Sequence, residues 1–192
     1  LGDVIHTLPA LTDAYQGYPH FQCDWVVEEA FAEIPTWHPA VKRVIPVALR
    51  RWRKQLWQTW RDGAWHQFIQ KITQQQYDFV IDAQGLLKSA ILTYQAKGLR
   101  CGLDYQSARE PLAALAYQQR YYLPKDLHAV TRIRQLFATI LAYPLPQHLP
   151  NYGIANHFQV TATHTLPTII FLHGTTWPTK HWPDCYWSEL AQ

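Results

Sequence analysis

The chain has 192 residues, of which 48% are hydrophobic and 16% charged, so it carries enough apolar surface for a packed core and is not intrinsically disordered. Its 8 glycines and 13 prolines follow no period, which excludes a collagen-like sequence. The net charge of +3 is unevenly distributed: residues 1–40 carry six acids and no Lys or Arg, whereas residues 41–71 carry eight Lys or Arg and one Asp. This local basic segment suggests an anionic partner.

Hydrophobic periodicity predicts helices and strands in alternation. In chain order we expect a helix over 7–15, a strand over 21–27, a short helix over 28–34, a strand over 41–47, helices over 50–60 and 65–75, a strand over 77–83, a helix over 86–95, a strand over 99–103, and helices over 111–117 and 129–141. The run YDFVIDA at 77–83 is typical of a strand buried on both faces of a parallel sheet. The pattern therefore predicts an α/β fold with a Rossmann-like parallel sheet covered on both faces.

Proline residues over 144–150 are expected to end a first domain at residues 1–150. Residues 151–192 then contain a linker, a strand over 168–172 and a helix from Pro183, which is how a second Rossmann-like domain would begin. The chain starts without Met and stops within a helical pattern. We therefore expect a first strand ahead of Leu1 and the other strands of the second domain after Gln192.

Cysteine usage and hydropathy disfavour two further classes of protein. Cys23, Cys101 and Cys185 lie far apart and form no CxxC pair, which favours reduced thiols over a disulfide framework or a zinc site. No apolar run reaches the roughly 18 residues of a transmembrane helix, so none is predicted.

Asp3 lies in the segment GDVIH, directly before the first expected helix. In a parallel α/β sheet, such a segment lies at the carboxyl edge of the strands, where ligands bind. Asp3 can act there as a general base, or it can cap the helix by accepting hydrogen bonds from free backbone amides. The two roles conflict, because a capping carboxylate is the weaker base. His6, one turn later, is expected to be a packed histidine.

Residues 50–54 (RRWRK) place four cations on one helical turn around a tryptophan. Arginine binds phosphate or carboxylate through two parallel hydrogen bonds, and Trp52 offers a flat face to a sugar ring. The alternative is a solvated helix face. Nucleic acid is not expected as a partner, since +3 is a small charge for that role and no nucleic-acid module is visible. The candidate anion-binding residues are Arg50, Arg51, Arg53 and Lys54.

The segment 82–85 (DAQG) follows the strongest predicted strand. Asp82 and Gln84 are therefore expected at the carboxyl edge of the sheet, in the ligand crevice. Gly85 either lets the backbone approach a ligand closely there, or it only provides the backbone conformation that the turn requires.

Two residues farther along the chain are further candidates for binding. Arg109 can hold an anionic substrate, or it can merely pair with Glu110 or Asp104. His128 begins the helix over 129–141, and its default role is structural.

The loop that follows the strand over 168–172 carries hydroxyls and an ammonium group. Free amides at a helix start bind phosphate, and Thr175, Thr176 and Lys180 would add to such a site. The phosphate loop GxxxxGK[ST] and the dinucleotide motif GxGxxG are both absent from the chain.

Together these segments resemble the ADP-heptose glycosyltransferases, which form glycosyltransferase family 9. The resemblance covers most of the chain in the order of the family, and RVIPVALRRWRK with IDAQGLLKSA is specific to its type I members. Residues 55–76 match the family poorly. The matching segments are GDVIHTLPALTDA (2–14), DWVVEE (24–29), VKRVIPVALRRWRK (41–54), YDFVIDAQGLLKSA (77–90), AREPLA (108–113), HAVTRIRQLFA (128–138) and FLHGTT with KHWP (171–183).

The resemblance implies a GT-B enzyme with two Rossmann-like halves facing across a cleft. It implies inverting heptose transfer from ADP-L-glycero-β-D-manno-heptose to Kdo2-lipid A, without a metal, by a monomer at the cytoplasmic face of the bacterial inner membrane. Asp3 falls on the expected base and Lys180 on the residue that stabilises the leaving diphosphate. Thr175 and Thr176 fall near the donor phosphates. The residues that match the positions at which the family binds its acidic acceptor are Arg50, Arg51, Arg53, Lys54, Arg109 and His128.

Other functions remain open on the sequence. One alternative is a transferase of the same family that adds a later core sugar, and another is a non-catalytic binder of anionic lipid or polymer that uses the Arg/Trp segment. Because most of the donor half is expected to lie beyond Gln192, we do not expect residues 1–192 alone to complete the reaction.

Overall fold

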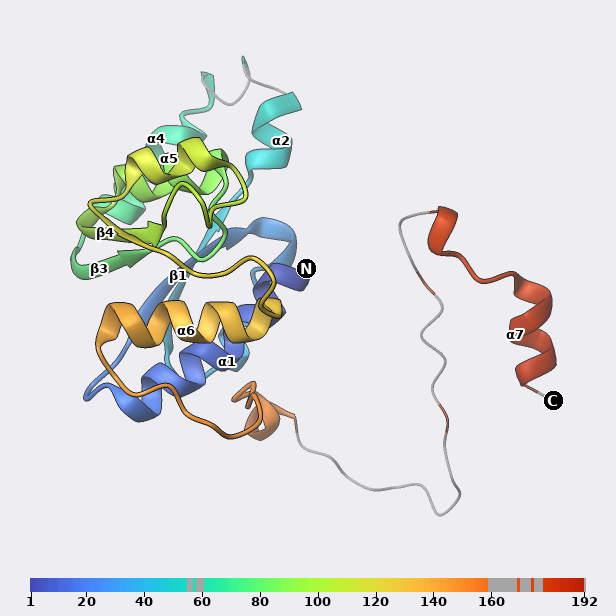
Figure 1. Ribbon diagram of the computed structural model, residues 1–192. Coiled ribbons are helices and arrows are strands. Elements are labelled where there is room, and N and C mark those ends of the chain that lie inside the picture. Colours follow the sequence, from blue (N-terminus) through green and yellow to red (C-terminus); the bar gives the residue numbers. More distant parts are fainter. Residues whose placement is uncertain (55–56, 58–60, 159–168, 170–173, 175–177, 192) are drawn as a thin grey trace. The chain divides into compact units, whose positions relative to one another are not determined.

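The structure is a computed structural model that describes residues 1–54, 57, 61–158, 169, 174 and 178–191 (Figure 1). It divides into two compact units, Leu1–Gln159 and Val160–Gln192, each described here by itself. The first unit extends beyond the expected boundary at 150. Tyr152 and Ile154 pack against the apolar cluster that contains Val4 and Leu8.

Within the described residues, the first unit has five strands in two parallel sheets. In one sheet β1 (Cys23–Glu28) pairs with β2 (Val41–Val47), and in the other β4 (Lys97–Leu103) lies between β3 (Gln76–Ile81) and β5 (Gln119–Tyr121). Every pairing is parallel, which confirms the expected α/β class. The strands form two sheets rather than one, and β5 was not expected, because QRY lacks an apolar signal.

Helices α1 (Gly2–Gly17) and α6 (Ala129–Leu141) pack together on one side of the sheets (Figure 1). Leu11 and Ala14 of α1 share a buried cluster with Leu136 and other apolar residues of α6. Within this interface Nε of Arg134 donates to a carboxylate oxygen of the fully buried Asp13 at 2.6 Å. A buried charge is tolerated only when it is paired, so this contact fixes the relative position of α1 and α6.

Helices α2 (Leu49–Lys54), α4 (Ala64–Thr73) and α5 (Leu87–Gln95) lie on the other side (Figure 1). Trp52 of α2 is buried against Phe68 and packs edge to face with Trp65. The expectation that Trp52 offers a flat face to a sugar is therefore wrong. Its ring is one side of an apolar core, and this burial directs the charged neighbours of Trp52 outward.

Several expected helices differ in length or type. The helix over 129–141 and the strand over 41–47 have the predicted bounds, whereas α1 begins at Gly2 rather than at Thr7. The helix expected over 111–117 begins with proline and is a 3-10 helix, and the short helix expected over 28–34 is a 3-10 turn at Glu29–Phe31. Among the residues that the structure describes, the 3-10 helices of the first unit are η1 (Glu29–Phe31), η2 (Ile34–Trp37), η3 (Pro111–Ala116) and η4 (Ala155–His157).

The second unit contains η5 (Pro178–Lys180) and α7 (Asp184–Leu190) among its described residues. The helix predicted from Pro183 is confirmed, with Pro183 at its N-cap. The strand predicted over 168–172 lies outside the described residues, apart from Ile169. Across the described residues, the structure contains no helix long and apolar enough to cross a membrane.

Candidate functional site

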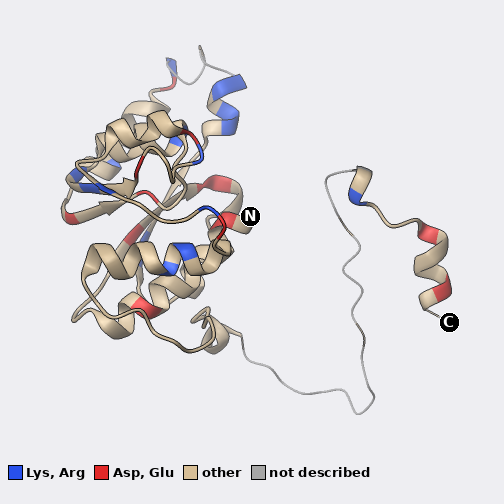
Figure 2. Ribbon diagram, viewed as in Figure 1, with Lys and Arg blue, Asp and Glu red and all other residues tan. Residues whose placement is uncertain are grey.

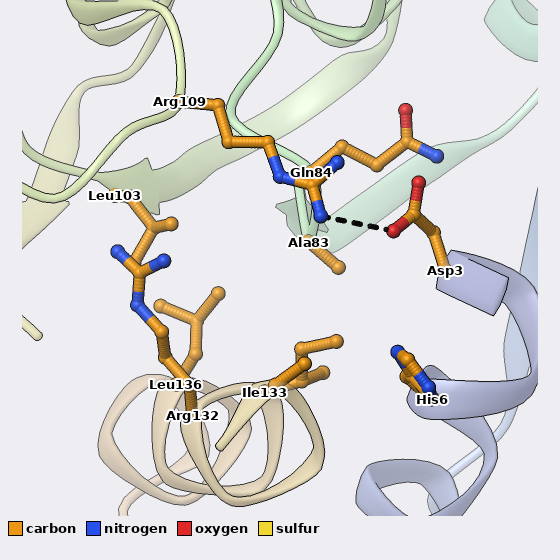
Figure 3. Close-up of a pocket in the computed structure, with 10 residues that line it drawn as sticks. Asp3, His6, Ala83, Gln84, Leu103, Arg109, Arg132, Ile133 and Leu136 are labelled. Carbon is orange, nitrogen blue, oxygen red and sulfur yellow. Dashed lines mark hydrogen bonds and ion pairs between the residues drawn. The ribbon is translucent and has the colours of Figure 1, made fainter. Parts of the chain in front are cut away.

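A small cavity of about 50 Å³ opens at the carboxyl ends of β3 and β4 (Figure 3). Ala83 and Gln84 follow β3, Leu103 ends β4, and helices α1 and α6 supply the opposite wall. Its lining residues are Asp3, His6, Ala83, Gln84, Leu103, Arg109, Ala129, Arg132, Ile133 and Leu136. The cavity thus lies where ligands bind in parallel α/β folds, as the sequence predicted for Asp3.

Asp3 lies in the first turn of α1, and its carboxylate meets Arg109 across the cavity (Figure 3). Nη2 of Arg109 donates to Oδ1 of Asp3 at 3.2 Å. The cap position belongs to Leu1 and no side-chain capping bond forms, so the alternative of Asp3 as helix cap is wrong. Because the two side chains are 42% and 56% exposed, this ion pair is weak and can open for a ligand.

Arg132 adds a second guanidinium group to the cavity wall. It donates to the backbone oxygens of Ser107 and Leu123, while its Nε is buried and has no hydrogen-bond partner among the described residues. Burial lowers the pKa of Arg132, and so does the positive charge of Arg109 nearby. Sequence reasoning missed Arg132, because only the tertiary fold shows that this turn of α6 faces the cavity.

Two histidines lie near each other, His6 in α1 and His128 at the start of α6. His6 lines the cavity, and its ring centre lies 6.3 Å from that of His128. Nδ1 of His128 accepts from the N–H of Val130 at 3.3 Å and so caps α6, which confirms the structural role considered for it.

The turn after β3 is built around Asp82, which is buried and does not line the cavity. Its Oδ1 accepts from the N–H groups of Gln84 and Gly85 at 2.8 and 3.2 Å, and its Oδ2 accepts from the hydroxyl of Tyr117 at 2.7 Å. The prediction that Asp82 lies in the crevice is therefore wrong, whereas Gln84 lines the cavity as expected. Gly85 has a positive φ of 64°, which a turn glycine tolerates.

The basic residues of α2 line a separate hollow of about 300 Å³ with the end of β1 and with η1. The guanidinium of Arg51 pairs with Glu29 at 2.9 Å, and the backbone N–H of Arg50 donates to Glu28. Lys54 also lines the hollow, and Arg53 is exposed beside it. These side chains are solvent-accessible cations at the carboxyl end of β2, and Arg51 is partly neutralised by Glu29 (Figure 2).

The candidate donor residues belong to the second unit. Lys180 ends η5 and is exposed, while Thr175 and Thr176 lie outside the described residues. Since the two units are described independently, the predicted convergence of Lys180 with Asp3 stays a prediction.

Comparison with known proteins places these features in one family. Residues 65–192 match the sequence pattern of glycosyltransferase family 9 (heptosyltransferase), which is more than half of the chain. The chain belongs to glycosyltransferase family 9. The family match includes Arg109, His128, Thr175, Thr176 and Lys180, and it begins after the basic cluster of α2.

Two curated relatives of this family 9 chain match nearly its whole length. Lipopolysaccharide heptosyltransferase 1 of Pseudomonas aeruginosa is 60% identical over 193 residues, which cover 100% of this chain and 54% of the relative. The enzyme of the same name from Escherichia coli K12 is 51% identical over 196 residues, covering 99% of this chain and 60% of the relative. The chain therefore spans between half and two thirds of the length of these relatives.

Solved structures agree with this family 9 assignment. The E. coli heptosyltransferase WaaC with ADP superposes with a TM-score of 0.90 at 51% identity, covering 99% of this chain and 60% of that one. The same enzyme with ADP-2-deoxy-2-fluoro heptose gives a TM-score of 0.90, covering 98% and 61%. The expected GT-B-like parallel α/β fold is thus confirmed.

Proposed function

We propose that this chain contains the acceptor-binding half and the start of the donor half of an inverting heptosyltransferase. The enzyme transfers L-glycero-D-manno-heptose from ADP-heptose to Kdo2-lipid A in lipopolysaccharide core synthesis. The observation that carries the proposal is the carboxylate of Asp3, which opens onto a cavity flanked by the guanidinium groups of Arg109 and Arg132 (Figure 3). The relatives named above, all heptosyltransferases, support it.

Asp3 is the proposed general base. Its carboxylate takes the proton of the acceptor hydroxyl as that oxygen forms a bond to the anomeric carbon of heptose, and the bond from that carbon to ADP breaks. Attack from the face opposite the leaving group inverts the anomeric centre. Lys180 stabilises the negative charge on the departing ADP, and Thr175 and Thr176 bind its phosphates.

Cationic side chains are proposed to hold the acidic acceptor. Arg109 exchanges its weak ion pair with Asp3 for a carboxylate of the acceptor, which leaves Asp3 free for the hydroxyl. His128 lies beside the cavity, next to His6. The cluster of α2 lies at a separate hollow, so it suits further anionic groups of the acceptor; Arg50, Arg51 and Lys54 line this hollow, and Arg53 is exposed.

The enzyme is proposed to work as a monomer at the cytoplasmic face of the inner membrane. Its acceptor is a lipid, so attraction between basic residues and an anionic surface would bring the two together.

The first test replaces the proposed base in the full-length protein. We expect Asp3→Asn to lower the turnover of ADP-heptose with Kdo2-lipid A by roughly 100-fold or more, because the amide cannot accept the proton. Thermal unfolding and ADP-heptose binding should stay near those of the wild type. Near-normal turnover would rule out Asp3 as the base.

A second assay separates the alternatives. Kdo2-lipid A is compared with an acceptor that already carries heptose, and the proposed function requires transfer to the first. Preference for the second would indicate a later step of core synthesis. Salt-sensitive anion binding that is indifferent to ADP-heptose, with no transfer, would indicate a non-catalytic module.

A further inference from the structure

Five large apolar side chains are exposed on one surface formed by α5 and η3. On α5, Leu87, Ile91 and Tyr94 are 43%, 54% and 61% exposed, and their spacing of four and three places them on one helix face. On η3, Leu112 and Leu115 are 62% and 64% exposed. We call this surface the α5–η3 face.

The packing between α5 and η3 explains why these side chains point outward. The two elements are in direct contact, and their shared buried cluster consists of Ala90, Ala113, Ala114 and Tyr117. Three of these four are alanines, so the two backbones come close together and the larger side chains remain outside. Large exposed apolar side chains gathered on two neighbouring elements in this way mark a contact site for another molecule or a membrane.

Positive charge surrounds the α5–η3 face. Nε of Arg100 donates to the backbone oxygen of Ala116, and its guanidinium lies 5.1 Å from the ring centre of Tyr94. Nε of Arg120 donates to the backbone oxygen of Ala114. These bonds hold both cations beside η3.

Two lysines add to this charge, and acidic residues offset part of it. Lys88 on α5 and Lys97 at the start of β4 are exposed. The acids are Glu110, whose carboxylate accepts from the backbone N–H of Leu87, and Asp78, which is exposed on β3 next to β4. The surroundings of the face are therefore cationic.

We propose that the α5–η3 face is the surface with which the protein docks on an anionic phospholipid bilayer. Leucine, isoleucine and tyrosine side chains flanked by arginine and lysine match the interfacial region, where apolar groups enter the acyl boundary and cations meet the phosphates. Helix α2 with its basic cluster lies on the same side of the sheets as α5 (Figures 1 and 2). A symmetric contact between two copies is disfavoured, because it would bring the cations of the two copies together.

The proposal goes beyond the transfer reaction, because it concerns phospholipid rather than the acceptor. It is tested with the full-length protein and vesicles of phosphatidylethanolamine and phosphatidylglycerol that contain no lipopolysaccharide precursor. We expect the wild type to co-sediment with these vesicles and to bind phosphatidylcholine vesicles more weakly. The double variant Ile91→Gln with Leu115→Gln should bind the anionic vesicles about tenfold more weakly, because both side chains lose their apolar contact with the bilayer.

Leu149→Gln is the matched control, since Leu149 is 87% exposed in the segment after α6, away from the α5–η3 face. It should bind vesicles like the wild type. Circular dichroism and heptose transfer to detergent-solubilised acceptor report folding and activity separately, so a failed transferase assay leaves the vesicle result intact. Unchanged binding by the double variant, or an equal loss in Leu149→Gln, would overturn the proposal. The proposal would also be overturned if the wild type were a dimer and the double variant were a monomer that still binds the vesicles.

Discussion

His38 is a buried imidazole that uses both of its ring nitrogens. Nδ1 accepts from the N–H of Ala40 at 3.1 Å, which requires this nitrogen to be unprotonated, and Nε2 lies 3.0 Å from the hydroxyl of Thr12. Gly153 lies against this pair, and a Cβ there would fall 2.5 Å from Nε2. At the residue scale, His38 is therefore fixed in its neutral form between α1, β2 and the segment after α6.

This environment makes stability depend on pH. Burial lowers the pKa of His38 from 6.5, so the unfolded chain takes up the proton at a higher pH than the folded one. The contribution of His38 to the free energy of unfolding is complete above pH 6.5 and is lost as the pH falls toward the pKa of His38 in the folded protein. Over this range the free energy of unfolding falls by up to about 1.4 kcal/mol per pH unit. Urea unfolding of wild type and His38→Gln between pH 8 and 5 measures this. The variant should show the smaller slope, and equal slopes would contradict the prediction.

At the scale of elements, the turn after β3 depends on a bond from a residue 35 positions away. The hydroxyl of Tyr117 donates to Asp82, which in turn holds the backbone at Gln84 and Gly85. We expect Tyr117→Phe to lower the free energy of unfolding by about 1.5–3 kcal/mol, because a buried carboxylate loses a donor. Tyr122→Phe, at an exposed tyrosine, should change it little. Equal effects in urea unfolding would show that the Asp82 bond does not stabilise the turn.

At the scale of the whole first unit, the polar network that joins the two sheets and the candidate site lie at opposite edges of the sheets. Near the amino ends of three strands, Oδ2 of Asp24 accepts from Nη2 of Arg43 and from the hydroxyl of Tyr77, both at 2.7 Å. This network joins the sheet of β1 and β2 to that of β3, while the cavity of Asp3 lies at the carboxyl ends. Substitution of Asp24 should therefore affect folding rather than transfer.

We expect Asp24→Ala to lower the free energy of unfolding by roughly 2–4 kcal/mol, since Arg43 and Tyr77 both lose their acceptor. Turnover measured well below the unfolding temperature should be near normal. Asp62→Ala, which breaks an exposed pair with Arg61, is the control and should cost less than about 1 kcal/mol. A large loss of turnover in a folded Asp24→Ala protein would contradict the separation of the two edges.

The sequence by itself determined the elements whose signal is local. The strand over 41–47 and the helix over 129–141 have the predicted bounds, because side-chain periodicity along a few turns or residues fixes them. The motifs around Asp3 and residues 50–54 also identified the family, since they require only the order of residues. The 3-10 turns and β5 were less visible, as short elements carry little periodic signal.

Only the tertiary structure decided which polar side chains face the cavity. Asp3 and Arg109 meet across 106 residues, whereas Asp82 turns inward to Tyr117 and Trp52 enters the core. Arg132 lines the cavity because α6 packs on α1, where Arg134 of α6 pairs with Asp13 of α1. The physical reason is that an ionic or hydrogen-bonded partner far along the chain sets the direction of a side chain. The spacing of residues in the sequence does not predict which residue that partner is.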